Sequence, residues 1–590
     1  MSFDFRRSHA PRDEAWGELQ VAVQRWALAH GGNPELARLA AWASLADAQA
    51  HAALDLRAGL DELAPMAADA IDALRGQPMV GDGEAPSAFV LDRAGRLFLW
   101  RNHAREAAIA TAVRARVAAT IGGVPDEADI DALFHGDASA AVQAQRAAVA
   151  GLPGRSLGVL TGGPGTGKTT TVLRVLAMAQ RQQQLAGEPP ARIAIAAPTG
   201  KAAQRLVQAL RDGKRALAAS AALPAHWLPL LEAIPDAEAM TVHRLLGFQP
   251  WDGRFARGPG APLEADIVVV DEASMLDLAQ LHALLGALRP DARLLLLGDA
   301  DQLTSVGTGT VLMDLVAALE GGPCLHRLTH VFRSARAPIL SAAVQAARTG
   351  DGRALRQAAD GAEFALQPCA DARALHARLD AWADALAALP LRGQPDTRGD
   401  AAQALDALQA LASRQLLTAL RTDAFGSEAC NARIEERLRL QWDVPADAPW
   451  YPGRAVMVVR NDPQSGLFNG DVGICLDDGE GQVRVWFETA ARDGQRHARS
   501  LPPAALPEHV GAFAVTIHKS QGSEFGHVAV LLPPDPGHRI LSRQLLYTGL
   551  SRASGSAELW ATPDAVDAAL ERVVTRVGGL RERLQAPTDD

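Results

Sequence analysis

The sequence of 590 residues contains no apolar run that approaches the ~18 residues of a membrane-spanning helix. Its first residues, MSFDFRRSHAPRDEAWGEL, mix acidic and basic side chains without an apolar stretch, so we expect no secretory signal. Hydrophobic residues make up 48% and charged residues 21%, an ordinary soluble composition. We therefore expect a cytoplasmic protein without a membrane partner, with about four domains at roughly 150 residues each.

Cysteine is scarce, and the four cysteines are far apart in sequence: Cys324, Cys369, Cys430 and Cys475. There is no CxxC pair, which excludes a zinc knuckle and any evident iron–sulfur motif. The spacing is typical of a protein from a reducing compartment.

Positive charge is also in short supply, since the net charge is −10 and the pI is about 5.9. Attraction of DNA by the overall field is therefore disfavoured, although a local basic channel could still bind it. Only four of the 58 basic residues are lysine (Lys168, Lys201, Lys214 and Lys519), so 54 are arginine. Where lysine is avoided so widely, a remaining lysine indicates a position that requires a compact ammonium group.

The chain divides into three regions. Residues 1–138 are rich in Ala, Leu, Asp and Arg and predict a helical domain without a catalytic signature. Simple packing would explain this region, and docking of a partner chain is the role we expect for it. After it, short apolar runs alternate with helical segments, the βαβ pattern of α/β domains. The expected strands are 156–161, 192–197, 266–272 and 293–299, then 415–421, 527–532 and 557–562.

We thus predict two P-loop NTPase (RecA-like) domains over residues 139–325 and 326–590. A hairpin at about 247–264 interrupts the first, and a small β module at about 440–510 interrupts the second.

The strongest motif, GGPGTGKT, starts at Gly162 and matches GxxxxGK[ST] between a predicted strand and a predicted helix. In such a loop the backbone N–H groups surround phosphates, Lys168 reaches the β- and γ-phosphates, and Thr169 holds Mg²⁺. DIVVVDE ends in Asp271, a second Mg²⁺ ligand, and Glu272, a general base for the attacking water. Gln302 in GDADQL follows the next strand and is positioned to contact the γ-phosphate.

Eight segments in a fixed order carry a family resemblance: GGPGTGKTT (162–170), APTGKAAQRL (197–206), TVHRLLG (241–247), VVVDEASM (268–275), GDADQLTSVGTG (298–309), THVFRS (329–334), VTIHKSQGSEF (515–525) and LLYTGLSRA (545–553). They resemble the motifs of superfamily 1 DNA helicases of the RecD family, which includes the alpha subunit of exodeoxyribonuclease V (the RecBCD complex). Residues 420–438 and 461–474 resemble that family too, so the likeness covers roughly residues 140–560.

The resemblance implies an ATP site and its residues. Arg333 and Arg552 resemble two arginines that the second motor domain places on the γ-phosphate. Gln145 resembles an adenine-reading glutamine, with Gln143 as the alternative that the spacing leaves open. The predicted nucleotide-binding set is Gly162, Gly163, Pro164, Gly165, Thr166, Gly167, Lys168, Thr169, Thr170, Gln145, Gly522 and Glu524.

The resemblance also implies contacts to the DNA backbone from Thr199, Lys201, Thr241, His243, Thr516, His518 and Lys519. For His243 a structural role is an equal alternative. Residues 247–266 resemble a hairpin that splits the duplex, and a plain surface hairpin is the alternative.

The predicted function is a DNA helicase and translocase driven by ATP with Mg²⁺, with 5′→3′ polarity implied by the resemblance. Its partners would be single-stranded and duplex-end DNA, a second helicase–nuclease chain and a scaffold chain, in double-strand break repair and recombination. No acidic cluster followed by a strand-borne lysine lies outside the motor motifs, so a nuclease site belongs to a partner chain. The alternatives are a stand-alone RecD-like or relaxase-type helicase, and a regulatory subunit with a vestigial ATP site.

Overall fold

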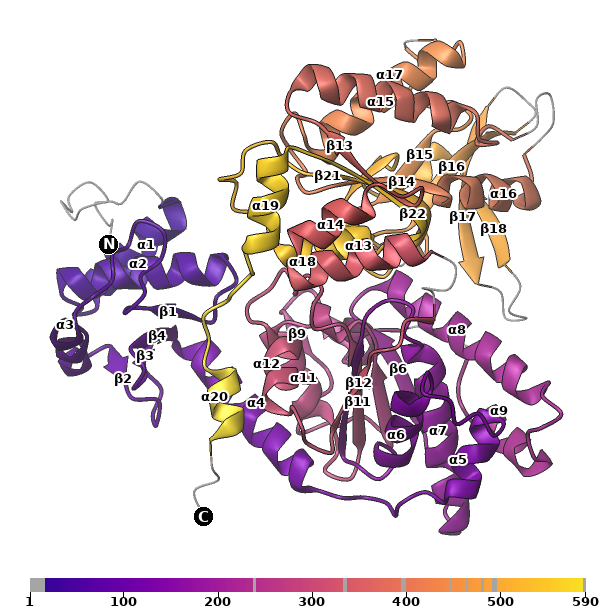
Figure 1. The fold of residues 1–590 in the computed structure, drawn as a ribbon. Coiled ribbons are helices and arrows are strands. Elements are labelled where there is room, and N and C mark those ends of the chain that lie inside the picture. The colour runs from indigo at the N-terminus through magenta and orange to yellow at the C-terminus, as the bar shows by residue number, and fades with distance from the viewer. Residues whose placement is uncertain are drawn as a thin grey trace.

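The computed structural model describes residues 16–586 apart from 237–239, 333–336, 394–398, 446, 463, 479–481 and 491–495. Figure 1 shows an N-terminal body beside two stacked α/β bodies, with the C-terminal segment returning to the first of the three. Within the described part of the chain, no helix is both long and apolar enough to cross a bilayer.

The N-terminal body combines helices with a small sheet. Its helices are α1 (Glu18–Ala29), α2 (Pro34–Ala48), α3 (Ala68–Ala73) and α4 (Trp100–Ala118). Its strands, in the order β1-β4-β3-β2, are β1 (Ala53–Asp55), β2 (Val80–Gly81), β3 (Phe89–Leu91) and β4 (Arg96–Leu99). Asn33 starts α2 by accepting a hydrogen bond from the Leu36 N–H at 2.7 Å, and Trp42 is buried in the core. The predicted helical character holds, but sequence analysis did not identify this sheet because its strands are only two to four residues long.

The first motor body is built on a parallel six-stranded sheet of order β12-β5-β11-β10-β6-β7. The strands are β5 (Leu157–Gly162), β6 (Ile193–Ala197), β7 (Met240–Thr241), β10 (Ile267–Val270), β11 (Arg293–Gly298) and β12 (Leu325–Leu328). The helices are α5 (Glu127–Phe134), α6 (Gln143–Gly151), α7 (Lys168–Leu185), α8 (Gly200–Ala218), α9 (Leu228–Glu232), α10 (Val242–Leu245), α11 (Leu278–Ala287) and α12 (Val311–Ala318). The four predicted strands of this body are confirmed, because runs such as IVVV in β10 are buried on both faces.

The second motor body has a parallel five-stranded sheet of order β13-β22-β21-β14-β20. Its strands are β13 (Phe364–Pro368), β14 (Arg414–Thr418), β20 (Ala514–Thr516), β21 (Phe525–Leu531) and β22 (Ala553–Ala561). Its helices are α13 (Pro338–Thr349), α14 (Gly352–Ala358), α15 (Ala372–Ala387), α16 (Ala401–Ala412), α17 (Ser427–Gln441), α18 (Arg543–Leu550) and α19 (Pro563–Glu571). The predicted start of this body at residue 326 falls inside β12, which pairs with β5 of the first sheet.

Two inserted modules interrupt the motor bodies. An antiparallel sheet of order β18-β17-β16-β15-β19 consists of β15 (Ala455–Val458), β16 (Val472–Asp477), β17 (Val483–Ala490), β18 (Arg496–Leu501) and β19 (His509–Gly511). A hairpin of β8 (Phe248–Gln249) and β9 (Arg254–Phe255) extends from the first body.

The chain ends by leaving the second motor body. After α19 it crosses the first motor body and finishes in α20 (Leu580–Gln585), which packs against α4 and α12 (Figure 1). Residues 572–585 are called the C-terminal strap below. The prediction of one domain over residues 326–590 did not include this return of the C-terminal segment to α4 and α12.

Candidate ATP and DNA site

The phosphate loop joins β5 to α7, as the motif predicts. Gly165 and Gly167 have φ angles of 77° and 84°, in the left-handed region that side chains disfavour. A Cβ on Gly167 would also lie 2.4 Å from Nε2 of Gln145. The loop therefore needs glycine both for its backbone shape and for the packing of Gln145 against it.

Lys168 lies at the start of α7 with its ammonium folded over the loop. Its Nζ donates to the carbonyl oxygens of Gly162 at 2.6 Å and Gly163 at 3.2 Å. Thr166 closes the same turn by donating to the Gly163 carbonyl oxygen at 2.8 Å. The Lys168 ammonium thus lies where the loop and the N-terminus of α7 favour an anion.

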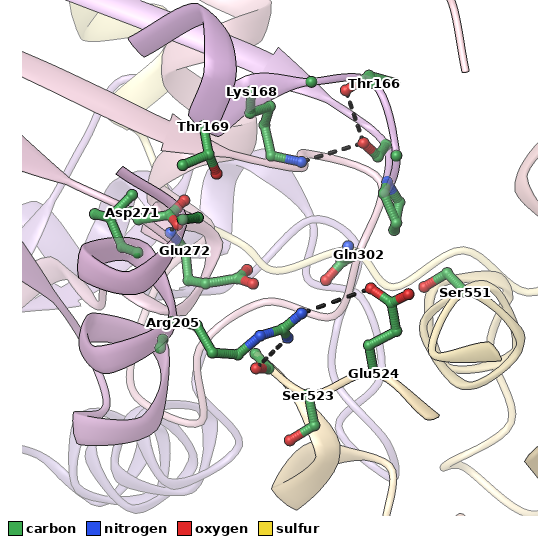
Figure 2. A pocket seen from close by; sticks show the side chains of 18 of the residues that line it. Thr166, Lys168, Thr169, Arg205, Asp271, Glu272, Gln302, Ser523, Glu524 and Ser551 are labelled. Atoms are coloured by element: carbon green, nitrogen blue, oxygen red, sulfur yellow. Dashed lines mark hydrogen bonds and ion pairs between the residues drawn. The ribbon is translucent and has the colours of Figure 1, made fainter. Parts of the chain in front are cut away.

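Asp271 and Glu272 follow β10 and line the same cavity as Lys168 and Thr169. Burial, followed by repulsion from Glu272, raises the pKa of Asp271 to about 6, and Lys168 opposes this shift. Glu272 has a φ of 51°, and its backbone N–H donates to Oδ1 of Asp271 at 2.8 Å. This strained turn directs the two carboxylates to different parts of the cavity (Figure 2).

Gln302 is almost fully buried near the start of the loop that joins β11 to α12. Its Nε2 donates to Oδ2 of Asp299 at 2.9 Å, while its Oε1 has no hydrogen-bond partner among the described residues. The Tyr547 hydroxyl of the second body donates to the same Asp299 oxygen at 2.7 Å. The second body thus contacts the carboxylate that holds Gln302.

The second motor body closes the other side of the cavity, whose volume is about 300 Å³. It contributes Gly522, Ser523, Glu524, Ser551 and Arg552 to the lining. Arg552 is 4% exposed and donates to the carbonyl oxygens of Thr548 at 3.2 Å and Ser523 at 3.4 Å. Burial lowers the pKa of Arg552, and the nearby Glu272 carboxylate opposes that shift.

Arg205 is a cavity residue that sequence analysis missed. It extends from α8 of the first body, donates to the Gly522 carbonyl oxygen, and lies 3.5 Å from Oε2 of Glu524 (Figure 2). A signal was present, because Arg205 stands four residues after Lys201 and therefore on the same face of the helix. It is a bridge between the motor bodies across the cavity.

The structure brings together most of the residues that were predicted to bind the nucleotide. Gln145 is buried and donates to the Thr166 carbonyl oxygen at 3.2 Å, whereas exposed Gln143 donates to the Ala138 carbonyl oxygen at 2.7 Å. Of the two candidates, only Gln145 contacts the phosphate loop. Arg333 lies outside the described residues.

The residues predicted to contact DNA follow the strands at one end of each sheet. Thr199 follows β6 and caps α8, and Thr241 ends the neighbouring strand β7 and caps α10. In the second body, Thr516 ends the edge strand β20, and His518 and Lys519 lie in the turn that follows. In the first body, β6 and β7 thus lie to one side of β5 and β11, which hold the phosphate loop and the Gln302 loop, and in the second body β20 lies at the edge of its sheet.

Three of these residues have tertiary contacts that bear on their role. Burial, then repulsion from Arg205, lowers the pKa of Lys201 to about 8, and Asp471 of the β module opposes this. Lys519 donates from Nζ to Oδ1 of Asn469 at 2.5 Å. Burial, then the charge of Arg576, lowers the pKa of His518. The β module therefore adjoins the predicted DNA path.

The hairpin predicted to split the duplex carries an aromatic cluster. The rings of Phe248 and Phe255 are 5.4 Å apart, and His243 packs on both at 5.1 and 5.9 Å. Trp251, in the turn between β8 and β9, is 80% exposed. For His243 this contact favours the structural alternative.

Comparison with known proteins gives consistent matches. Residues 145–308 match the model of an AAA domain, and residues 511–559 match the model of a UvrD-like helicase C-terminal domain. The RecBCD enzyme subunit RecD of Mycobacterium tuberculosis is 36% identical over 541 residues, covering 90% of this chain and 87% of that protein. The ATP-dependent RecD2 DNA helicase of Deinococcus radiodurans is 31% identical, covering 74% of this chain and 51% of that protein. The Pif1 helicase of Candida albicans aligns structurally at 16% identity and a TM-score of 0.36, over 71% of this chain and 94% of that one.

Proposed function

The chain belongs to the RecD family of RecBCD enzyme subunits, and on that basis we propose the reaction and residue roles that follow. It is an ATP-dependent DNA helicase that works as one subunit of a RecBCD-type complex, with the nuclease on a partner chain. We propose that it moves 5′→3′ on the strand it holds and acts in double-strand break repair. The buried, unpaired state of all four cysteines supports a cytoplasmic location.

One observation carries the proposal: a single cavity is lined by both motor bodies. The first body contributes Lys168, Asp271 and Glu272, and the second contributes Glu524 and Arg552. A nucleotide bound there would touch both bodies, so hydrolysis would change the contacts between them. Because the predicted DNA residues also lie on both bodies, closure and opening of the cavity would displace one DNA contact relative to the other.

Each residue in the cavity has a chemical role in this scheme. Lys168 would leave the Gly162 carbonyl oxygen for the β- and γ-phosphates. Glu272 would accept a proton from the attacking water, and Gln302, with its free Oε1, would orient that water or the γ-phosphate. Arg552 would spread the charge that develops on the transferred phosphoryl group.

The oxygen donors present suit Mg²⁺. The Asp271 carboxylate and the Thr169 hydroxyl line the cavity together, and Mg²⁺ prefers one or two such oxygens plus substrate phosphates. When bound, Mg²⁺ would neutralise phosphate charge during hydrolysis.

The deciding experiment is ATP hydrolysis by the purified chain with and without single-stranded DNA. We expect strong stimulation by DNA. An ATPase rate that stays at background with DNA, both for the chain alone and for the complex purified from its native cell, would favour the regulatory subunit with a vestigial ATP site.

Identity favours the complex subunit over the stand-alone helicase. The chain is 36% identical to the Mycobacterium tuberculosis RecD subunit over 90% of its length and 31% identical to the RecD2 helicase over 74% of its length. We therefore propose partners that include a second helicase–nuclease chain and a scaffold chain. Purification from the native cell followed by mass spectrometry should recover both, and recovery of the chain alone would favour the stand-alone helicase.

DNA affinity should depend on salt only modestly in this acidic protein. We expect a slope of about −0.7 per neutralised phosphate for single strands, with little dependence on base sequence. Lys519→Ala should weaken binding and reduce the slope, because it removes one phosphate contact. Lys214→Ala is the control, since Lys214 binds the Ile234 carbonyl oxygen and Asp236 instead. Titration of oligonucleotides at several salt concentrations measures both, and an equal change of slope in the two variants would contradict the proposed channel.

The hairpin should act on the duplex and not on hydrolysis. Stacking of a base on an exposed aromatic ring contributes about 1–3 kcal/mol, so Trp251→Ala should slow duplex unwinding roughly tenfold. ATPase stimulated by single strands should stay at the wild-type rate. Leu185→Ala, at another exposed apolar side chain, is the control. Normal unwinding by Trp251→Ala would favour the plain surface hairpin.

A further inference from the structure

The C-terminal strap contacts all three bodies of the protein within a few residues. At its start, Arg572 donates to the carbonyl oxygens of His538 at 2.6 Å and Leu541 at 3.3 Å, in the second motor body. Five residues later, the Val577 carbonyl oxygen accepts from the Ala52 N–H at 2.8 Å, in the N-terminal body. The strap is therefore held at these two points by bodies other than the one it crosses.

Between these anchors, Arg576 binds the first motor body. Its NH1 donates to the carbonyl oxygens of Gly307 at 2.8 Å and Gly309 at 2.9 Å, and its NH2 donates to that of Ser305 at 2.6 Å. These carbonyls belong to residues 305–309, the loop segment that follows Gln302. One planar guanidinium thus holds three carbonyls of the segment next to Gln302.

The partners of the Arg576 guanidinium are carbonyl oxygens and not a carboxylate. Burial lowers its pKa, and no carboxylate of the described chain lies within ion-pair distance of it. A half-buried guanidinium without a carboxylate costs free energy that carbonyl dipoles offset only in part. Stability alone does not require a charged side chain at this position. A guanidinium presents several N–H donors in one rigid plane, which suits it to holding a loop in place.

The N-terminal body holds the same segment from its own side. The Gly309 N–H donates to the Ala50 carbonyl oxygen at 2.9 Å, and the Thr308 hydroxyl donates to Oδ1 of Asp47 at 3.1 Å. At the other end of the loop, Gln521 of the second body donates to the Leu303 carbonyl oxygen at 3.0 Å. The loop that carries Gln302 is therefore hydrogen-bonded to the N-terminal body, to the C-terminal strap and to the second motor body.

We propose that Arg576 is a positioning residue for ATP hydrolysis, which fixes residues 305–309 and thereby Gln302 against the γ-phosphate. The inference rests on the proposed function, and it adds a regulatory link: movement of the N-terminal body relative to the motor bodies would pull the strap and the Gln302 loop together. A partner chain bound to the N-terminal body would then alter the rate of hydrolysis without touching ATP.

The test compares Arg576→Ala with Arg572→Ala in the full chain. Both variants remove an arginine that binds backbone carbonyls of a loop, but only Arg576 contacts the Gln302 loop. We expect Arg576→Ala to lower the kcat of DNA-stimulated ATP hydrolysis about tenfold while the Kd for ATP stays within about twofold, since Gln302 acts in turnover. Arg572→Ala should keep kcat within about twofold of wild type. Hydrogen exchange should speed up at the amides of residues 305–309 in Arg576→Ala only.

Further variants cover a failure of Arg576→Ala to fold. Thr308→Val removes one hydroxyl contact to the N-terminal body and should lower kcat in the same direction, by a smaller factor, and Arg576→Lys should restore part of the rate. Unchanged kcat in Arg576→Ala and Thr308→Val, or equal losses in the Arg576 and Arg572 variants, would overturn this inference alone. A wild-type chain without DNA-stimulated ATPase would overturn the proposed function and this inference with it.

Discussion

Lys168→Gln should abolish DNA-stimulated ATP hydrolysis, with kcat reduced at least 10²-fold, about 2.7 kcal/mol of lost transition-state stabilisation. The reason is geometric: Lys168 is the cation of the phosphate loop, and its ammonium already lies 2.6 Å from the Gly162 carbonyl oxygen, at the mouth of the loop. Glutamine keeps most of the length of the side chain and removes its charge. Steady-state ATPase with saturating DNA measures the effect.

Two controls separate chemistry from folding. The melting temperature of Lys168→Gln should match that of wild type, because the side chain contacts loop carbonyls and not the core. Lys168→Arg keeps the charge but replaces a compact ammonium by a larger planar guanidinium, which we expect to suit the phosphate loop less well. Full activity of Lys168→Arg would contradict the inference drawn from the scarcity of lysine, and more than a tenth of the activity in Lys168→Gln would contradict the assigned role.

Arg552→Ala should lower kcat about 10³-fold, the range observed for arginines that stabilise phosphoryl transfer. Affinity for ATP should change far less, because the guanidinium interacts with charge that develops only in the transition state. Its position supports this, since Arg552 is buried in the second motor body beside a cavity whose phosphate loop belongs to the first. Single-turnover hydrolysis and equilibrium binding of a fluorescent ATP analogue measure the two quantities separately.

Burial makes a stability control necessary for this variant. Arg552 donates to the carbonyl oxygens of Thr548 and Ser523, and the alanine removes both hydrogen bonds. Arg552→Lys keeps a positive charge and tests whether charge alone suffices. If binding of ATP and kcat fell by the same factor, Arg552 would belong to ground-state binding. The same measurements on Arg333→Ala apply to the second predicted arginine.

Local sequence accounted for the two motor sheets and for the content of the ATP site. Strands such as β10 and β11 are continuous apolar runs, and such a run indicates a strand that is buried on both faces of a parallel sheet. Asp271 directly follows such a strand, and Lys168 and Gln302 lie within or just after the loop that follows one, so their common edge follows from parallel pairing of the strands. The resemblance of eight ordered motifs then indicated the RecD family, and the comparisons confirm it.

Short strands and the orientation of a helix could not be predicted from local sequence patterns. The strands β1 to β4 are too short to show an alternation of apolar and polar residues. The sequence also did not indicate to which of the two motor sheets β12 belongs, and the structure pairs it with β5 of the first. The choice between Gln143 and Gln145 depended on which face of α6 meets the phosphate loop. Only packing of α6 decides that, and it places Gln145 against Thr166.

The sequence by itself therefore determined the fold class, the phosphate loop with its acidic partners, and the family. Only the tertiary structure decided that Arg205 and Arg576, among 54 arginines, lie at the site or beside its Gln302 loop. Arg205 reaches a residue 317 positions later in the chain, and Arg576 holds carbonyls 267 to 271 positions earlier. Such contacts leave no periodic trace in sequence, because their partners are backbone carbonyls that every residue carries, and only folding brings those carbonyls within reach of a particular guanidinium.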